Sequence, residues 1–175
     1  MRQLSKFVVL TGLLALSGCG ADPQPAPKSA APAIERGVFI SATDCAATGK
    51  LTLDQCGDAI DKAVASHEAH APVFAALDRC EAMFGQDRCD KGFDQRYRPR
   101  LQAFFVILAK PARAVPLYPP ANNMIGFQSP SKQPINATDE TLRVSVAALT
   151  VAHENAKLPS GSGEATSGSV AADVH

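Results

Sequence analysis

The sequence predicts a small α+β domain that is stapled by disulfides and built on a helical hairpin with flanking short strands. Three observations support this fold class: a cluster of cysteines between positions 45 and 89, amphipathic helical segments among them, and short β-rich runs on either side. The chain has 175 residues, so one small domain is all that fits once the polar ends are subtracted. We place this domain at residues 37–152.

The first residues, 1–18, have the pattern of a secretory signal. Arg2 and Lys6 precede the uncharged run FVVLTGLLAL, which is too short for a membrane helix because spanning a bilayer takes about 20 apolar residues. Leu16-Ser17-Gly18-Cys19 follows and is similar to the bacterial lipobox, whose cysteine is acylated when the signal is removed. We therefore expect Cys19 to carry lipid such as palmitate and to anchor the chain to a membrane.

The stretches on either side of the domain have compositions typical of extended or disordered chain. Residues 19–36 carry several prolines among small residues, which favours an extended tether. Residues 153–175 are rich in Gly, Ser, Ala and Thr without apolar periodicity, and we expect a disordered tail.

Because Gly20 stands where an aspartate would favour the inner membrane, we expect the protein to be anchored at the periplasmic face of the outer membrane.

The strand before the cysteines is short, since only residues 38–41 favour β structure. A first helix begins at Thr52, which forms a capping box with Gln55, and Pro72 ends it near His70. A second helix runs from residue 74 to residue 84, with Gly85 as its stop. Its expected inward face comprises Phe74, Leu77, Cys80, Met83 and Phe84.

The cysteines that remain after lipidation predict two structural disulfides. Their spacings lack the close pairs of a zinc site and the C-x-x-C of a redox motif. Four cysteines allow three pairings. If the helices form an antiparallel hairpin, the midpoints of Cys56–Cys80 and Cys45–Cys89 both lie near its turn, so we favour this nested pairing.

The C-terminal half of the domain has weaker signals. Residues 101–109 are apolar all round, which favours a buried strand, although a core helix is an alternative. Residues 142–151 alternate at first and predict another strand. The proline-punctuated segment between them is expected to be irregular.

A basic stretch, RCDKGFDQRYRPR, is the strongest candidate for binding. Arg96, Arg98 and Arg100 could grip carboxylate or phosphate groups of an envelope protein or an anionic cell-wall component, with Tyr97 as an aromatic anchor. The alternative is a solvated loop with no partner.

Several function classes are disfavoured. The chain carries 17 basic and 17 acidic residues, so it lacks the electrostatic footprint of a nucleic-acid-binding protein. No acid pair, nucleophile–base set or phosphate loop is visible, and we expect neither an enzyme nor a cofactor. His67 and His70 could share a helix face, but H-E-x-x-H would need histidine where Ala71 stands, so we expect no metal site.

Residues 37–90 resemble the YgiB-like family of uncharacterised bacterial lipoproteins. The shared marks are Val38-Phe39, Ser41, Asp44-Cys45, Gly49, Gln55-Cys56, Ala71-Pro72, Phe74, Cys80-Glu81, Phe84-Gly85 and Cys89. The chain departs from the family at LQAFFVILA, where members often have a segment rich in glycine and methionine. The resemblance implies an envelope location and paired cysteines but supplies no reaction.

We therefore expect a lipid-anchored envelope protein of non-enzymatic, binding or structural function. The alternatives are an accessory factor or enzyme of envelope thiol, polyamine or peptidoglycan metabolism, or a metal carrier that uses His67 and His70.

Overall fold

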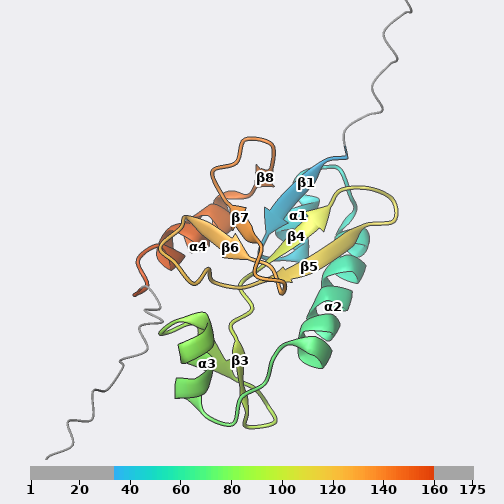
Figure 1. The fold of residues 1–175 in the computed structure, drawn as a ribbon. Coiled ribbons are helices and arrows are strands. Elements are labelled where there is room, and N and C mark those ends of the chain that lie inside the picture. The colour runs from blue at the N-terminus through green and yellow to red at the C-terminus, as the bar shows by residue number, and fades with distance from the viewer. Residues whose placement is uncertain (1–33, 160–175) are drawn as a thin grey trace, which may run out of the picture. The chain divides into compact units, whose positions relative to one another are not determined.

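The computed structural model describes residues 34–159. This part of the chain contains both helices and strands (Figure 1). The α+β class predicted from the sequence is confirmed. The predicted signal, the lipidation site Cys19 and nearly all of the tether lie outside the described residues, as does the tail after residue 159. No helix within residues 34–159 is long and apolar enough to cross a bilayer.

The central sheet has the strand order β5-β4-β1-β8. Strands β1 (Arg36–Phe39), β4 (Ala103–Ile107) and β5 (Arg113–Leu117) pair antiparallel, whereas β8 (Arg143–Val144) runs parallel to β1. Val38 pairs with Phe105, and Phe39 pairs with Phe104. Because consecutive residues of a strand point to opposite faces of the sheet, Val38 and Phe39 lie on different faces. The strand predicted at residues 38–41 is confirmed, although β1 begins and ends two residues earlier. The buried strand predicted within residues 101–109 is also confirmed, as the shorter β4.

One face of this sheet is covered by α1 (Ala42–Ala46) and α2 (Leu53–His70). Gln55 N–H donates to Thr52 Oγ1 at 3.2 Å while Thr52 N–H donates to Gln55 Oε1 at 3.0 Å, so the predicted capping box is present. The helix also ends where predicted, before Pro72. Its apolar side joins the sheet in a core of Phe39, Cys45, Leu51, Cys56, Ile60, Ala63, Phe104 and Val106.

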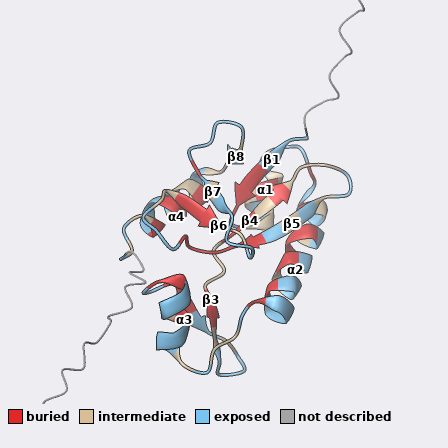
Figure 2. Cartoon of the chain, in the orientation of Figure 1, coloured by how far each residue is buried: buried red, intermediate tan, exposed pale blue. Residues whose placement is uncertain are grey.

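The other face carries β6 (Gly126–Gln128), β7 (Pro134–Asn136) and α4 (Val146–Asn155). Their core comprises Val38, Ala103, Leu117, Phe127, Ala137, Ala148 and Ala152. Figure 2 shows that buried positions lie on the sheet strands and on the inward sides of α2 and α4.

Two sequence predictions fail on this side. Residues 142–151 form two strand residues and then a helix, because the Ser145 hydroxyl accepts the Ala148 N–H at 3.0 Å and caps α4. The segment expected to be irregular contains β5, β6 and β7. Its prolines are compatible with strands because Pro116 lies on β5, an edge strand, and Pro134 is the first residue of β7.

The predicted helical hairpin is wrong. Helix α3 (Leu77–Phe84) packs on the strand pair β2 (Cys89–Lys91) and β3 (Tyr97–Pro99), whereas α2 packs on α1 and β5. The connection between the helices is extended, and Phe74 exchanges backbone hydrogen bonds of 2.8 Å with Tyr97. That pairing draws α3 onto β3 and away from α2 (Figure 1). Leu77 and Met83, expected inward, are 39% and 50% exposed.

The nested disulfide pairing is wrong for the same reason. The bonds join Cys45 to Cys56 and Cys80 to Cys89, with Cα–Cα distances of 6.0 and 6.2 Å. Each bond links two cysteines that follow one another in the sequence. The first bond joins α1 to the start of α2, and the second joins α3 to β2. The predicted involvement of all four residues in disulfides agrees with the structure.

Candidate functional site

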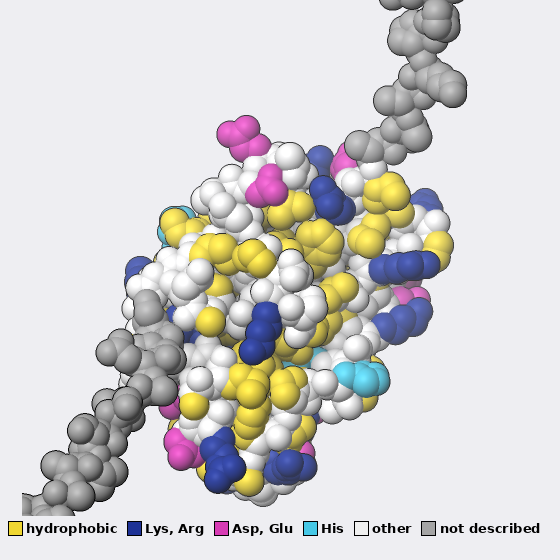
Figure 3. All heavy atoms as spheres, viewed as in Figure 1, with side chains coloured by type: hydrophobic (Ala, Val, Ile, Leu, Met, Phe, Trp, Pro, Cys, Tyr) yellow, Lys and Arg dark blue, Asp and Glu magenta, His cyan; other side chains and the backbone are white. Residues whose placement is uncertain are grey.

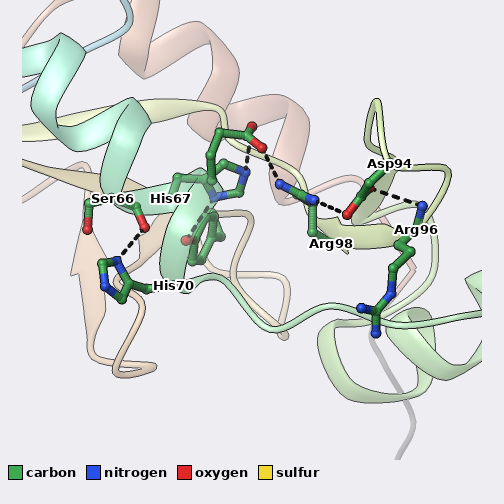
Figure 4. A network of polar contacts seen from close by, with 8 residues as sticks. Ser66, His67, His70, Asp94, Arg96 and Arg98 are labelled. Atoms are coloured by element: carbon green, nitrogen blue, oxygen red, sulfur yellow. Dashed lines mark hydrogen bonds and ion pairs between the residues drawn. The ribbon is translucent and has the colours of Figure 1, made fainter.

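The β2–β3 hairpin and Arg100, the residue after it, carry the side chains that the sequence singles out for binding, but the structure gives them different surroundings. Arg98 is buried, with only 7% of its surface exposed. Its Nη1 donates to the Glu68 carboxylate at the end of α2, and its Nη2 donates to Asp94 Oδ2 at 2.8 Å (Figure 4). The charge of Arg98 is thus balanced inside the molecule, which assigns it a role in holding the hairpin to α2.

Tyr97 and Arg100 are also engaged with their own chain. Tyr97 is partly buried and packs against the small core of Cys80, Phe84 and Cys89. Arg100 Nε donates to Asp90 Oδ1 at 3.0 Å across the strand pair. Arg96 differs, because its side chain is exposed and makes no hydrogen bond or ion pair within residues 34–159, while its backbone N–H donates to Asp94 Oδ1 at 3.1 Å. Among the predicted binding residues, Arg96 is the one most available to a partner.

Sequence reasoning missed the importance of Phe93. This residue lies in the turn between β2 and β3 and is fully exposed. The turn is closed by Gln95 N–H donating to Gly92 O at 3.0 Å and by Gly92 N–H donating to Arg96 O at 2.7 Å. We call Lys91, Phe93 and Arg96 the hairpin tip. Its signal in the sequence was an aromatic residue between Gly92 and Asp94, two residue types that favour turns.

Two anchors hold the hairpin behind its tip. The Cys80–Cys89 disulfide ties the start of β2 to α3, and the Arg98–Glu68 ion pair ties β3 to α2. Figure 3 shows basic and acidic side chains interspersed on the visible face around α3 and β3. The hairpin therefore presents an aromatic side chain and two cations on a constrained support.

A second polar cluster lies behind Arg98. His67 Nδ1 is 3.0 Å from Tyr118 Oη, and His67 Nε2 is 4.0 Å from Glu68 Oε1. Glu68 Oε1 is too far from Nε2 for a hydrogen bond, so the direction of the His67–Tyr118 bond follows the tautomer of His67: the Tyr118 hydroxyl donates when Nε2 carries the proton and accepts when Nδ1 carries it. Burial lowers the pKa of His67 and raises the pKa of Tyr118 to about 12.

Both of these side chains are buried, so the pair connects elements inside the protein. His70 is exposed, and its Nδ1 lies 3.1 Å from the Ser66 carbonyl oxygen, on another side of the helix end (Figure 4). The two histidines suggested for a shared metal thus have separate surroundings. Within residues 34–159 no three or more His, Cys, Asp or Glu side chains are grouped so that they could hold a metal ion.

These observations define a class of protein: a disulfide-stapled α+β domain in which the His67–Tyr118 contact and the Arg98–Glu68 ion pair join elements from within, and in which the hairpin tip is exposed. The chain belongs to the family described as protein of unknown function (DUF1190), whose model matches residues 34–154. No curated protein and no solved structure matches the chain. The family is uncharacterised, which agrees with the uncharacterised family that the sequence resembles.

Proposed function

We propose that this chain is a lipid-anchored protein of the bacterial envelope that works by binding, and that the hairpin tip makes the contact. The partner would carry carboxylate or phosphate groups, as an anionic cell-wall component or an envelope protein does. The alternatives raised by the sequence, an envelope enzyme or a metal carrier, have no specific observation in their favour.

One observation carries this proposal: Phe93 is fully exposed at the end of a hairpin that is anchored at its base. A large aromatic side chain in water forgoes the roughly 1.5–3 kcal/mol that burial would provide. Aromatic and arginine side chains are also the types that dominate binding energies at interfaces. Phe93 beside Arg96 therefore has the composition of a contact site, and a supported hairpin loses little entropy on binding.

The envelope location rests on the sequence. The basic start, the short apolar run and Leu16-Ser17-Gly18-Cys19 favour export and acylation, and the resemblance to YgiB-like lipoproteins supports the same location. Two disulfides fit an oxidising compartment such as the periplasm.

The test is photo-crosslinking in intact cells with benzoylphenylalanine in place of Phe93. The control is the same amino acid at Leu53, which is 54% exposed at the start of α2 and far from the hairpin in sequence. We expect an adduct from position 93 and none from position 53. A muramidase-sensitive adduct would identify the cell wall as partner, and a discrete band would identify an envelope protein.

A paired variant makes the test specific for the tip. Replacing Phe93 and Arg96 together by Ser should reduce retention on the captured partner at least tenfold, and should leave the urea unfolding curve unchanged because both side chains are exposed. Retention should also fall as salt rises, since exposed charges are screened. Equal adducts at positions 93 and 53, or unchanged retention by the double variant, would refute the proposal.

A further inference from the structure

Arg88 is the largest fully buried side chain of the described chain, with 0% of its surface exposed. No ion pair of Arg88 occurs within residues 34–159. Its neighbour Asp87 is exposed, and the nearby Glu81 uses Oε1 to accept the Asp87 N–H at 2.9 Å. A guanidinium keeps its proton at any ordinary pH, so Arg88 is a buried cation to which no carboxylate of residues 34–159 is hydrogen-bonded.

The hydrogen bonds of Arg88 leave one edge of the guanidinium free. Nη1 donates to the carbonyl oxygens of Gln86 and Pro159. Nε and Nη2 are buried and have no hydrogen-bond partner in the described part of the chain, residues 34–159. Nε–H and one Nη2–H are parallel within the guanidinium plane and form the edge that binds both oxygens of a carboxylate or phosphate.

The local chain is shaped around this guanidinium. A Cβ added to Gly85 would lie 2.4 Å from Arg88 Nη1 and 2.9 Å from its Cδ, so a side chain at this position would displace Arg88. Gly85 also has φ +102, which other residues rarely adopt. The next residue after Arg88 is Cys89, which the disulfide fixes to α3. The cation is thus held in place by its surroundings.

We propose that the free edge of Arg88 is a binding site for one carboxylate or an equivalent oxyanion. An unpaired buried ion costs several kcal/mol, which pairing with an anion would offset. Gln86 and Pro159, whose carbonyl oxygens accept hydrogen bonds from Nη1, are both exposed residues. The carboxylate has two sources: another molecule, or an acidic side chain of the sequence after Pro159, where Glu164 and Asp173 occur.

The experiment compares thermal unfolding of the full chain in acetate and in chloride of equal ionic strength. An external source predicts that acetate raises the wild-type Tm by about 2–4 °C, the usual effect of a ligand well above its Kd. An internal source predicts that Glu164→Gln or Asp173→Asn lowers the Tm and creates the response to acetate. Arg113→Met, a change at an exposed arginine of β5, should behave as the wild type.

Arg88→Met should abolish every response to acetate, and so should Arg88→Lys, which keeps the charge but lacks the two-donor edge. If Arg88→Met does not fold, the Arg88→Lys protein and the NMR signal of the Arg88 Nε–H supply the comparison. That signal should move with acetate in the wild type or in the responsive acid variant. The proposal is overturned if neither the wild type nor the acid variants respond to acetate and the Nε–H signal is unchanged throughout.

Discussion

Tyr118 Oη lies 3.0 Å from His67 Nδ1, although 51 residues separate the two side chains in the sequence. The contact joins the C-terminal end of α2 to the chain that follows β5, and the two ring centroids are 5.5 Å apart. Glu68, the next residue of α2, contacts Arg98 on β3. One turn of α2 therefore connects the central sheet to the hairpin that carries Phe93.

Replacing Tyr118 by Phe should lower the free energy of unfolding by about 1–2 kcal/mol, because the buried Nδ1 of His67 would lose its hydrogen-bond partner. Urea unfolding followed by circular dichroism measures the change. Tyr97→Phe is the matched control, since the structure gives the Tyr97 hydroxyl no hydrogen bond in residues 34–159 and this substitution should have little effect. An equal loss in both variants would contradict the importance of the His67–Tyr118 contact.

The buried His67 should make stability depend on pH. Burial lowers its pKa in the folded state from the ordinary value of 6.5. Above pH 6.5 His67 is neutral in both states and its full contribution is present; as pH falls below 6.5 the unfolded state takes up the proton first, so stability falls. The slope can reach about 1.4 kcal/mol per pH unit.

This dependence is measured as the difference in unfolding free energy between pH 7.5 and pH 5.5, two values on either side of the titration. The wild type and the exposed-histidine variant His153→Gln should lose stability over this interval, whereas His67→Gln should lose less. If His67→Gln keeps the full wild-type slope, the dependence belongs to other groups.

Arg98 and Arg96 should respond oppositely to the same substitution. Arg98→Met should destabilise the protein by about 1–3 kcal/mol, because it removes a buried hydrogen-bonded charge and leaves Glu68 and Asp94 unpaired. Arg96→Met should change stability by less than about 0.5 kcal/mol, as is usual for an exposed side chain. Equal effects of the two substitutions on urea unfolding would refute these assignments.

How far the sequence predicted this structure depended on whether the signal was local. The capping box at Thr52, the end of α2 before Pro72 and a buried strand within residues 101–109 follow from neighbouring residues, and these predictions are confirmed. The helical hairpin failed because it required knowing that Phe74 pairs with Tyr97, a contact between distant segments.

At the candidate site, too, some features can be predicted from neighbouring residues and others depend on contacts between distant segments. An Arg-rich stretch can be seen in the sequence, but whether each arginine is exposed depends on what folds against it. Arg98 is buried because Glu68 lies in the last turn of α2, which only the tertiary structure brings to β3. Phe93 lies in the same stretch, but its full exposure follows from its place in the turn between β2 and β3, which the sequence alone does not show.

The disulfide connectivity can be checked by digesting unreduced protein and identifying linked peptides by mass spectrometry. We expect the pairs Cys45–Cys56 and Cys80–Cys89, and no free thiol at these positions. Each bond closes a loop of similar length, with sequence separations of 11 and 9, so removing either pair should cost about 3 kcal/mol. Recovery of Cys56–Cys80 peptides would contradict the structure.

Membrane attachment is tested at Cys19, which lies outside the described residues. Cys19→Ala should abolish labelling with radioactive palmitate and leave an uncut precursor. Cys45→Ala with Cys56→Ala is the control, because loss of a disulfide should leave the labelling intact. Unchanged labelling of the Cys19→Ala protein would refute lipidation at this position.

The pairing of consecutive cysteines has a consequence for biogenesis. If the chain enters the periplasm from its N-terminus, Cys56 arrives as the next available partner of Cys45, and Cys89 as the next partner of Cys80. With Cys19 acylated, an oxidase that joins cysteines in the order in which they emerge would thus form both native bonds directly. The protein should therefore mature without the isomerase that non-consecutive disulfides require.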